Sequence, residues 1–101
     1  MAKRPIANTV LTRIRPGGER VPLTVEIGRQ YRARNGTWRT PIKLKGLDRK
    51  IADIAGEDSF QSLCLALRMA HSRLAAVIAE GDKPAYDDGS EFPLEAYFPK
   101  F

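Results

Sequence analysis

Residues 58–80, DSFQSLCLALRMAHSRLAAVIAE, constrain the fold most, because they combine apolar helical periodicity with signals for both ends of a helix. Asp58 precedes the first apolar residue and Gln61 follows three positions later, which is the spacing of an N-terminal capping box. Gly81 and then Pro84 are typical of a helix end. The pattern therefore predicts one long helix over 58–80.

The predicted helix is apolar on two sides. We expect the main stripe, about 100° wide on a helical wheel, to cover a sheet, and it contains Phe60, Leu63, Cys64, Leu67, His71, Leu74 and Ile78. A second apolar patch on the opposite side consists of Leu65, Met69 and Ala76, with Arg68 and Arg73 flanking it. We expect a dimer or partner interface there, with coverage by the chain's own tail, or simply scattered exposed side chains, as the alternatives.

Strand patterns precede the helix. In 6–15 one side holds Ile6, Val10 and Ile14, which we expect to face the core. The segment 21–27 alternates apolar and polar residues strictly, and RPGGER between the two segments predicts a turn. These two segments are typical of a pair of strands with one buried face.

A third strand is expected in TWRTPIKLK, after the tight turn that Asn35-Gly36 favours. Its inward residues would be Trp38, Ile42 and Leu44. The short segment KIADIAG is either a fourth strand or a helical turn, and we favour the strand.

The tail 81–101 is too rich in Pro and polar residues at first for regular structure, but it ends in an aromatic cluster. We expect this cluster to pack on the body of the protein or on a neighbouring subunit, and it contains Phe92, Leu94, Tyr97, Phe98 and Phe101. The expected fold class is α+β: strands within 5–54 form an antiparallel sheet of three to four strands, packed against the helix 58–80 in a single domain spanning 1–101.

Charge is distributed unevenly along the chain. Residues 1–50 hold thirteen Lys and Arg against three acids, and residues 51–101 hold four against nine. The basic half could bind nucleic acid through the sheet face opposite the helix and an Arg-rich loop, which would use Arg13, Arg15, Arg39, Lys43, Lys45, Arg32 and Arg34. The simpler interpretation is that these residues keep exposed strand faces soluble.

Residues able to carry chemistry are few. Cys64 is the sole cysteine, so neither a disulfide within one chain nor a cysteine-based zinc cluster can form. His71 is the sole histidine, lies in the apolar stripe, and is expected to be structural. The acidic loop GDKPAYDDGSE lacks the spacing of a calcium site, and no nucleotide-binding or protease motif occurs. We therefore expect no enzyme activity, metal or cofactor.

Location in the cell is inferred from what the sequence lacks. No uninterrupted apolar run reaches the roughly 20 residues of a membrane helix, and MAKRPIANTVL contains no apolar segment typical of a secretory signal. Together with the single cysteine, this predicts a cytoplasmic protein without a membrane span.

The segment GLDRKIADIAGEDSFQSLCLALRMAHSRL, followed by FPLEAYFP, resembles a family of small uncharacterised bacterial proteins described as a domain of unknown function. The shared pattern is a strand-rich half followed by a helix start, here Gly56, Asp58, Ser59, Gln61, Leu63, Leu65, Ala66 and Leu67. The resemblance covers about 24–99 and implies a fold but no activity.

The expected function is a non-enzymatic interaction module. It would associate with itself as a homodimer, or bind and mask another protein, through the patch of Leu65, Met69 and Ala76. Nucleic-acid binding by the basic face is the alternative function.

Overall fold

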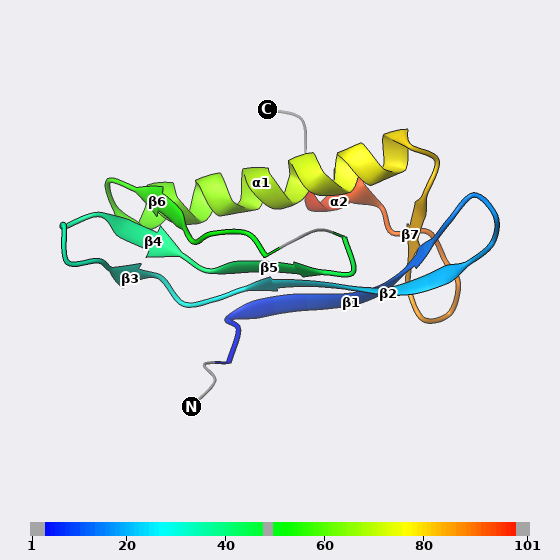
Figure 1. The fold of residues 1–101 in the computed structure, drawn as a ribbon, viewed down its shortest axis with the longest axis horizontal. Helices are drawn as coiled ribbons and strands as arrows, with labels where there is room; N and C mark the ends of the chain where they lie inside the picture. The colour runs from blue at the N-terminus through cyan, green and yellow to red at the C-terminus, as the bar shows by residue number, and fades with distance from the viewer. Residues whose placement is uncertain (1–3, 48–49, 99–101) are drawn as a thin grey trace.

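A computed structural model of the protein describes residues 4–47 and 50–98. Strands form one layer and a long helix lies across them (Figure 1). The elements in chain order are β1 (Ala7–Ile14), β2 (Arg20–Ile27), β3 (Tyr31–Arg32), β4 (Trp38–Thr40), β5 (Ile42–Lys45), β6 (Ile54–Gly56), α1 (Ser59–Ala79), β7 (Lys83–Ala85) and α2 (Leu94–Tyr97). The predicted α+β class is confirmed.

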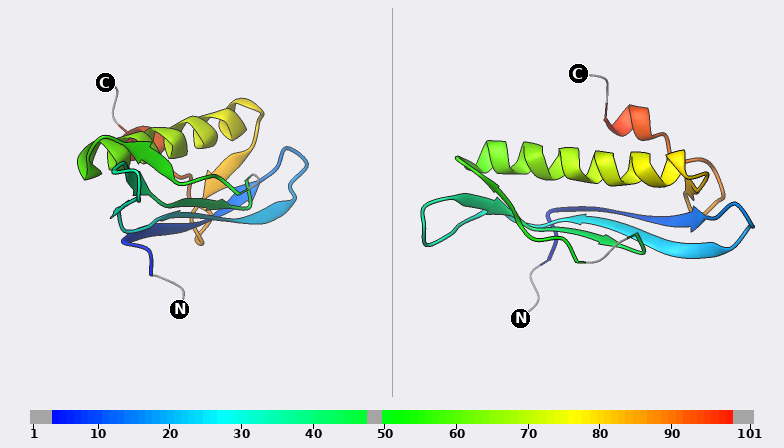
Figure 2. Two further views of the ribbon diagram at one scale, coloured as in Figure 1. Left: turned by 60° about the vertical axis from the view of Figure 1, so that its left-hand side comes forward. Right: turned by 45° about the horizontal axis from the view of Figure 1, so that its top comes forward.

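The strands form two antiparallel sheets. One sheet has four strands in the order β5-β2-β1-β7, and the other has three in the order β3-β4-β6. Helix α1 covers both, and α2 lies beside it in the helical layer (Figure 2).

The β1–β2 hairpin determines which β1 residues face the core. Leu11 lies opposite Leu23 and Thr9 opposite Val25, and directly opposed residues share one face of a sheet. Leu11, Leu23 and Val25 are buried, whereas Ile6 is 53% and Val10 57% exposed. The prediction that Ile6 and Val10 face the core was therefore wrong, because pairing with β2 turns the other side of β1 inward.

The third predicted strand is divided at Pro41. Thr40 and Ile42 are both buried, as predicted for this side, but β4 pairs with β3 and β6 whereas β5 pairs with β2. The Pro41 carbonyl accepts a hydrogen bond from the Gly28 N–H, with an N···O distance of 2.9 Å. One predicted strand thus supplies both sheets, and the fourth strand predicted in KIADIAG is found as β6.

Both ends of α1 follow the sequence signals. The Asp58 carboxylate accepts a hydrogen bond from the Gln61 N–H at 2.7 Å, and the Gln61 side chain accepts one from the Glu57 N–H at 2.7 Å. Gly81 ends the helix with φ of +100°, a conformation that glycine adopts without strain.

The face of α1 that covers the sheets differs from the expected stripe. Its buried residues are mostly small, namely Ser62, Ala66, Ala70, Leu74 and Val77. Phe60 remains 74% exposed, Leu67 37% and Ile78 39%. The helix is therefore rotated away from the predicted orientation, and only Leu74 of the expected stripe is fully buried.

Close approach of the helix to β4 and β6 explains why small residues face the sheets. The hydroxyls of Thr40 and Ser62 form a buried hydrogen bond. A Cβ on Gly56 would lie 2.5 Å from the Ser62 backbone nitrogen. A helix this near to a sheet leaves no room for large side chains between them.

The tail contains more regular structure than predicted. β7 pairs with residues 12–14 of β1, and the tail then bonds back on β7 through the Phe92 N–H and the Pro84 carbonyl at 3.0 Å. Phe92 is buried, and Leu94 and Phe98 pack against the core, as expected for the aromatic cluster. The expected role of Phe101 lies outside the described residues.

α1 is long and apolar enough to cross a membrane by length and composition alone. Core helices of soluble proteins meet the same two conditions. Here five α1 side chains are buried against the body of the protein, and Arg68 and Arg73 lie in its middle.

We predict that Gly56→Ala destabilises the protein by about 1–3 kcal/mol, because the added methyl group overpacks the contact with Ser62. Urea unfolding measures this change. Gly17→Ala is the control, since a Cβ there meets open space and should change stability by no more than about 0.5 kcal/mol. Equal stability of the two variants would contradict the close contact.

Candidate protein-interaction site

One edge of the four-stranded sheet is partly open. β7 pairs with β1 only at residues 12–14, whereas β2 pairs with the whole of β1 on its other side. Within residues 4–47 and 50–98, no strand pairs with the outer edge of 7–11, which we call the free edge. Unpaired strand edges bind other strands readily, so natural proteins cover them or protect them with charge.

An apolar groove lies beside the free edge. It has a volume of about 160 Å³ and is lined by β1, β2, α1 and the tail through Ala7, Asn8, Thr9, Val25, Ile27, Leu67, Leu74, Phe92, Tyr97 and Phe98. Small-molecule pockets are larger, at roughly 300–1,000 Å³. The groove is therefore better suited to side chains of a protein partner.

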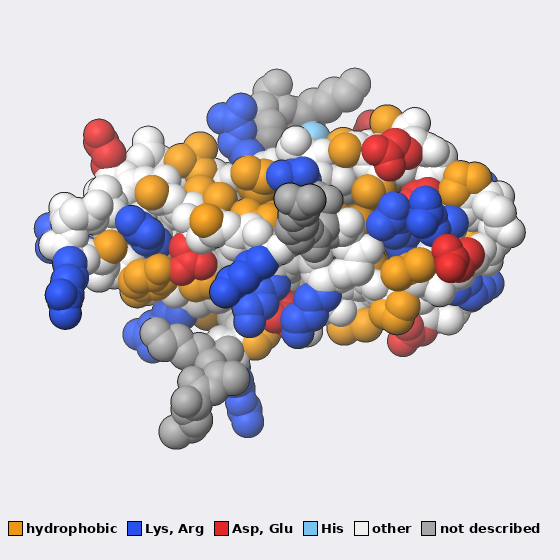
Figure 3. All heavy atoms as spheres, in the orientation of Figure 1, with side chains coloured by type: hydrophobic (Ala, Val, Ile, Leu, Met, Phe, Trp, Pro, Cys, Tyr) orange, Lys and Arg blue, Asp and Glu red, His pale blue; other side chains and the backbone are white. Residues whose placement is uncertain are grey.

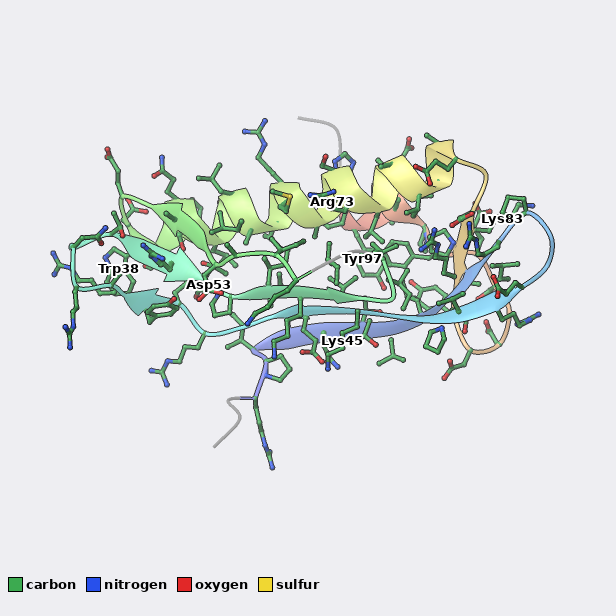
Figure 4. All side chains as sticks on the ribbon, in the orientation of Figure 1. Trp38, Lys45, Asp53, Arg73, Lys83 and Tyr97 are labelled. Carbon is green, nitrogen blue, oxygen red and sulfur yellow. The ribbon has the colours of Figure 1, made fainter. Side chains whose placement is uncertain are left out.

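Exposed apolar side chains line this groove and continue from it along one side of α1. Leu67 and Tyr97 line it and are 37% and 49% exposed, and Figure 4 shows Tyr97 between the helical layer and the sheet. Phe60 and Ile78 extend the same side of α1, within about 20° of Leu67 on the helical wheel. The stripe expected to cover the sheet is instead partly a solvent-facing surface.

α2 forms one wall of the groove, and contacts between aromatic rings hold α2 and the residues beside it in place. The Phe92 and Tyr97 rings lie 4.5 Å apart, and the His71 ring lies 5.2 Å from Phe98. The Tyr97 hydroxyl is 2.7 Å from that of Tyr86. His71 thus contacts the tail.

The predicted interface patch is divided by the structure. Met69 is half-buried and packs against the core, whereas Leu65 is 36% exposed and Ala76 is exposed. The flanking Arg68 and Arg73 are exposed. A partner interface on this side stays a prediction, but only Leu65 and Ala76 could contribute freely accessible apolar surface to it.

A basic surface occupies a different region. Three adjoining hollows contain Arg4, Arg29, Lys43, Lys45 and Lys50, and the largest has a volume of about 680 Å³. Lys43 and Lys45 are exposed on β5, and Figure 3 shows Lys and Arg side chains gathered near the middle of this face. The Lys45 Nζ lies 3.4 Å from Glu26 Oε1, and this carboxylate offsets part of the positive charge of the basic surface.

The predicted nucleic-acid residues do not all share this surface. Arg13 was wrongly expected on the outer face: its parity is that of buried Leu11, and it forms an ion pair with buried Asp82. Arg15 is exposed beyond the end of β1, 4.0 Å from Glu19. Arg39 is half-buried opposite Tyr31.

Arg32 and Arg34 are exposed around the β3–β4 turn. In the sequence they are close to residues of the basic surface, but neither of them lines its three hollows. Of the predicted strand residues, Lys43 and Lys45 line them, and so does Arg29 of the predicted Arg-rich loop, whereas Arg4 and Lys50 are residues that the prediction missed. Strand periodicity could not find these two, because they lie outside the strands.

Chemical features other than binding surfaces are sparse. Across the described parts of the chain, no group of three or more His, Cys, Asp or Glu side chains could hold a metal ion. The Tyr31 hydroxyl donates to Asp53, and this bond raises the Tyr31 pKa above its usual value of 10.0. Cys64 is a half-buried free thiol.

We predict that Tyr97→Phe lowers the pKa of Tyr86, which the Tyr97 hydroxyl raises to about 12. A raised tyrosine pKa means that the bond contributes to stability below the ordinary pKa of 10.0 and is lost as pH rises toward 12. Tyrosinate absorbance during a pH titration measures the shift. Tyr31→Phe is the control, because it also removes one tyrosine but does not touch Tyr86. A Tyr86 pKa that stays at about 12 in Tyr97→Phe would contradict the bond.

No curated protein and no solved structure matches this chain. A family model described as a domain of unknown function, DUF6968, matches residues 7–90. The match spans both sheets and α1, and confirms the resemblance to a domain of unknown function. The chain belongs to the DUF6968 family.

Proposed function

We propose that the protein is a non-enzymatic interaction module that associates with another copy of itself through the free edge and the adjoining groove. The observation that carries this proposal is the apolar groove beside an unpaired strand edge. A strand edge supplies backbone hydrogen bonds, and the groove supplies sites for side chains, which together are one common mode of protein recognition.

The charge of the two sheet edges supports the same choice. β5, at the opposite side of the sheet, carries exposed Lys43 and Lys45, and lysine on an edge strand opposes pairing with another sheet. The free edge 7–11 has the sequence ANTVL and no charge. Along residues 7–11 the outer strands of the four-stranded sheet are β1 and β5, and of these two only β1 lacks protecting charges.

Leu65 and Leu67 allow a matched test of the surface. They are 36% and 37% exposed and lie about 160° apart on the α1 wheel, so a substitution at each should affect folding similarly. We predict that Leu67→Glu weakens self-association by about tenfold or more, equivalent to about 1.4 kcal/mol, whereas Leu65→Glu changes it little.

Light scattering over a concentration series measures the association, with circular dichroism as the control for folding. The reverse result, in which Leu65→Glu dissociates the protein, would favour the patch of Leu65 and Ala76. A wild-type protein that is monomeric at every concentration would overturn self-association.

Nucleic-acid binding is a second candidate, because five basic side chains border the adjoining hollows on one surface. Within the described residues, Arg4, Arg29, Lys43 and Lys50 form no salt bridge. These cations could follow a phosphate backbone. Tyr31 is the aromatic side chain lining these hollows, but its hydroxyl is already bound to Asp53.

We predict for this candidate that Lys43→Glu combined with Lys45→Glu weakens binding to a single-stranded oligonucleotide of any sequence. Loss of two phosphate contacts should reduce the slope of log affinity against log salt by about 1.4. Fluorescence anisotropy at several salt concentrations measures the slope. Arg68→Glu is a control away from these hollows, and wild-type protein without salt-sensitive binding would exclude the candidate.

We further propose a cytoplasmic location, since the single thiol of Cys64 suits a reducing compartment. The burial of one side of α1 against the sheets supports a core helix over a membrane span. Neither the interaction surface nor the basic surface requires a cofactor.

A further inference from the structure

Hydrogen bonds around β7 identify the backbone groups that point outward from β1. Pro84 has no N–H, and its carbonyl accepts from Phe92, so the backbone of Pro84 faces away from β1. Because bonded and non-bonded pairs alternate in an antiparallel ladder, the neighbouring pairs Thr12–Ala85 and Ile14–Lys83 are the bonded ones. Even-numbered residues of β1 therefore direct N–H and C=O toward the β7 side.

The opposite side of β1 agrees with this assignment. Arg15 is odd-numbered, and its N–H donates to the Glu19 carbonyl at 2.8 Å, across the β1–β2 hairpin. Asn8 and Val10 consequently present their N–H and C=O groups along the free edge. Ile6 does not extend this edge, because its N–H donates to the Ile27 carbonyl at 2.8 Å where the chain bends.

We propose that two copies join their β1 strands antiparallel about a two-fold axis at Thr9. Asn8 of each copy then lies opposite Val10 of the other, and Thr9 lies opposite Thr9. Each Asn8–Val10 pair exchanges two hydrogen bonds, so the two pairs form four. The two four-stranded sheets become one continuous sheet. This inference rests on the proposed self-association and specifies its geometry.

The available bonding groups favour this register over its neighbours. An axis at Asn8 would oppose Val10 to Ile6, whose N–H is already bonded to Ile27. An axis at Val10 would oppose Asn8 to Thr12, which pairs with β7. Only the axis at Thr9 uses both Asn8 and Val10 of each copy, and it lies at the midpoint of the free edge 7–11.

Side chains are compatible with the same arrangement. Thr9 would form a non-hydrogen-bonded pair with its copy, in which Cα atoms lie about 4.5 Å apart and opposed threonines are favourable. Ala7 and Thr9 both line the apolar groove, so the grooves of the two copies would lie on the same face of the joined sheet. A second copy also has the uncharged edge that this pairing needs.

A disulfide across the axis tests the register. The test uses Thr9→Cys in a Cys64→Ser background, with Asn8→Cys and Val10→Cys as matched controls, each two residues out of register with its own copy. At about 10 μM protein, Thr9→Cys should form a covalent dimer roughly a hundredfold faster than random collision, since the effective concentration at a bound interface is roughly millimolar. Non-reducing electrophoresis under mild oxidation measures the rates.

A dimer by light scattering in which Asn8→Cys cross-links as fast as Thr9→Cys would overturn this register and leave the proposed function standing. A monomer at all concentrations would overturn both. If Thr9→Cys instead cross-links to a strand of another protein, and this chain forms no dimer, then a second copy is not what occupies the free edge.

Val10→Pro provides a second test that does not depend on a cysteine. Its N–H points outward, and proline is tolerated where an edge-strand N–H faces solvent, so the monomer should stay folded by circular dichroism. Each Val10→Pro copy lacks the N–H donor of one of the four hydrogen bonds, so the dimer loses two of them. We therefore expect the dimer to dissociate. Val10→Thr keeps the N–H and should remain dimeric; a Val10→Pro variant that stays dimeric would overturn the pairing.

Discussion

The register of β1 on β2 is the constraint on which the rest of the structure depends. It places Leu11 opposite Leu23 in the core and leaves Val10 57% exposed on the other face. A shift of one residue would exchange the two faces of β1. The same register turns Arg13 inward to buried Asp82, which ties β1 to the connection between α1 and β7. The alternating backbone directions that leave the N–H and C=O groups of Asn8 and Val10 without a strand partner among the described residues follow from it as well.

The small residues on the buried face of α1 affect the protein surface as well as the core. Ser62 approaches Gly56 and bonds to Thr40, and this closeness selects small side chains for the buried face of the helix. Large apolar residues such as Phe60 and Leu67 are consequently displaced to the side, where they are exposed. Packing and the proposed interaction surface are thus linked, because the rotation of α1 that fits the sheets also exposes apolar side chains beside the groove.

Much of the fold could be predicted from local sequence. The capping pair Asp58 and Gln61, Gly81 at the helix end and the turns of both hairpins are local signals, and the structure contains each of them. The inward faces of β1 and α1 could not be derived in this way, because strand pairing and helix–sheet distance are tertiary properties. The lysines of β5 were correctly expected on the exposed face, whereas the free edge arises only because β7, a strand absent from the prediction, stops at residue 12.

Amide hydrogen exchange of wild-type protein tests pairing at the free edge most directly. The N–H groups of Asn8 and Val10 should exchange slowly at high protein concentration and faster on dilution, because only the second copy protects them. The N–H groups of Thr9 and Leu11 face β2 and should stay protected at both concentrations, which makes them an internal control. Fast exchange of Asn8 and Val10 at every concentration, with Thr9 and Leu11 protected, would contradict association through this edge.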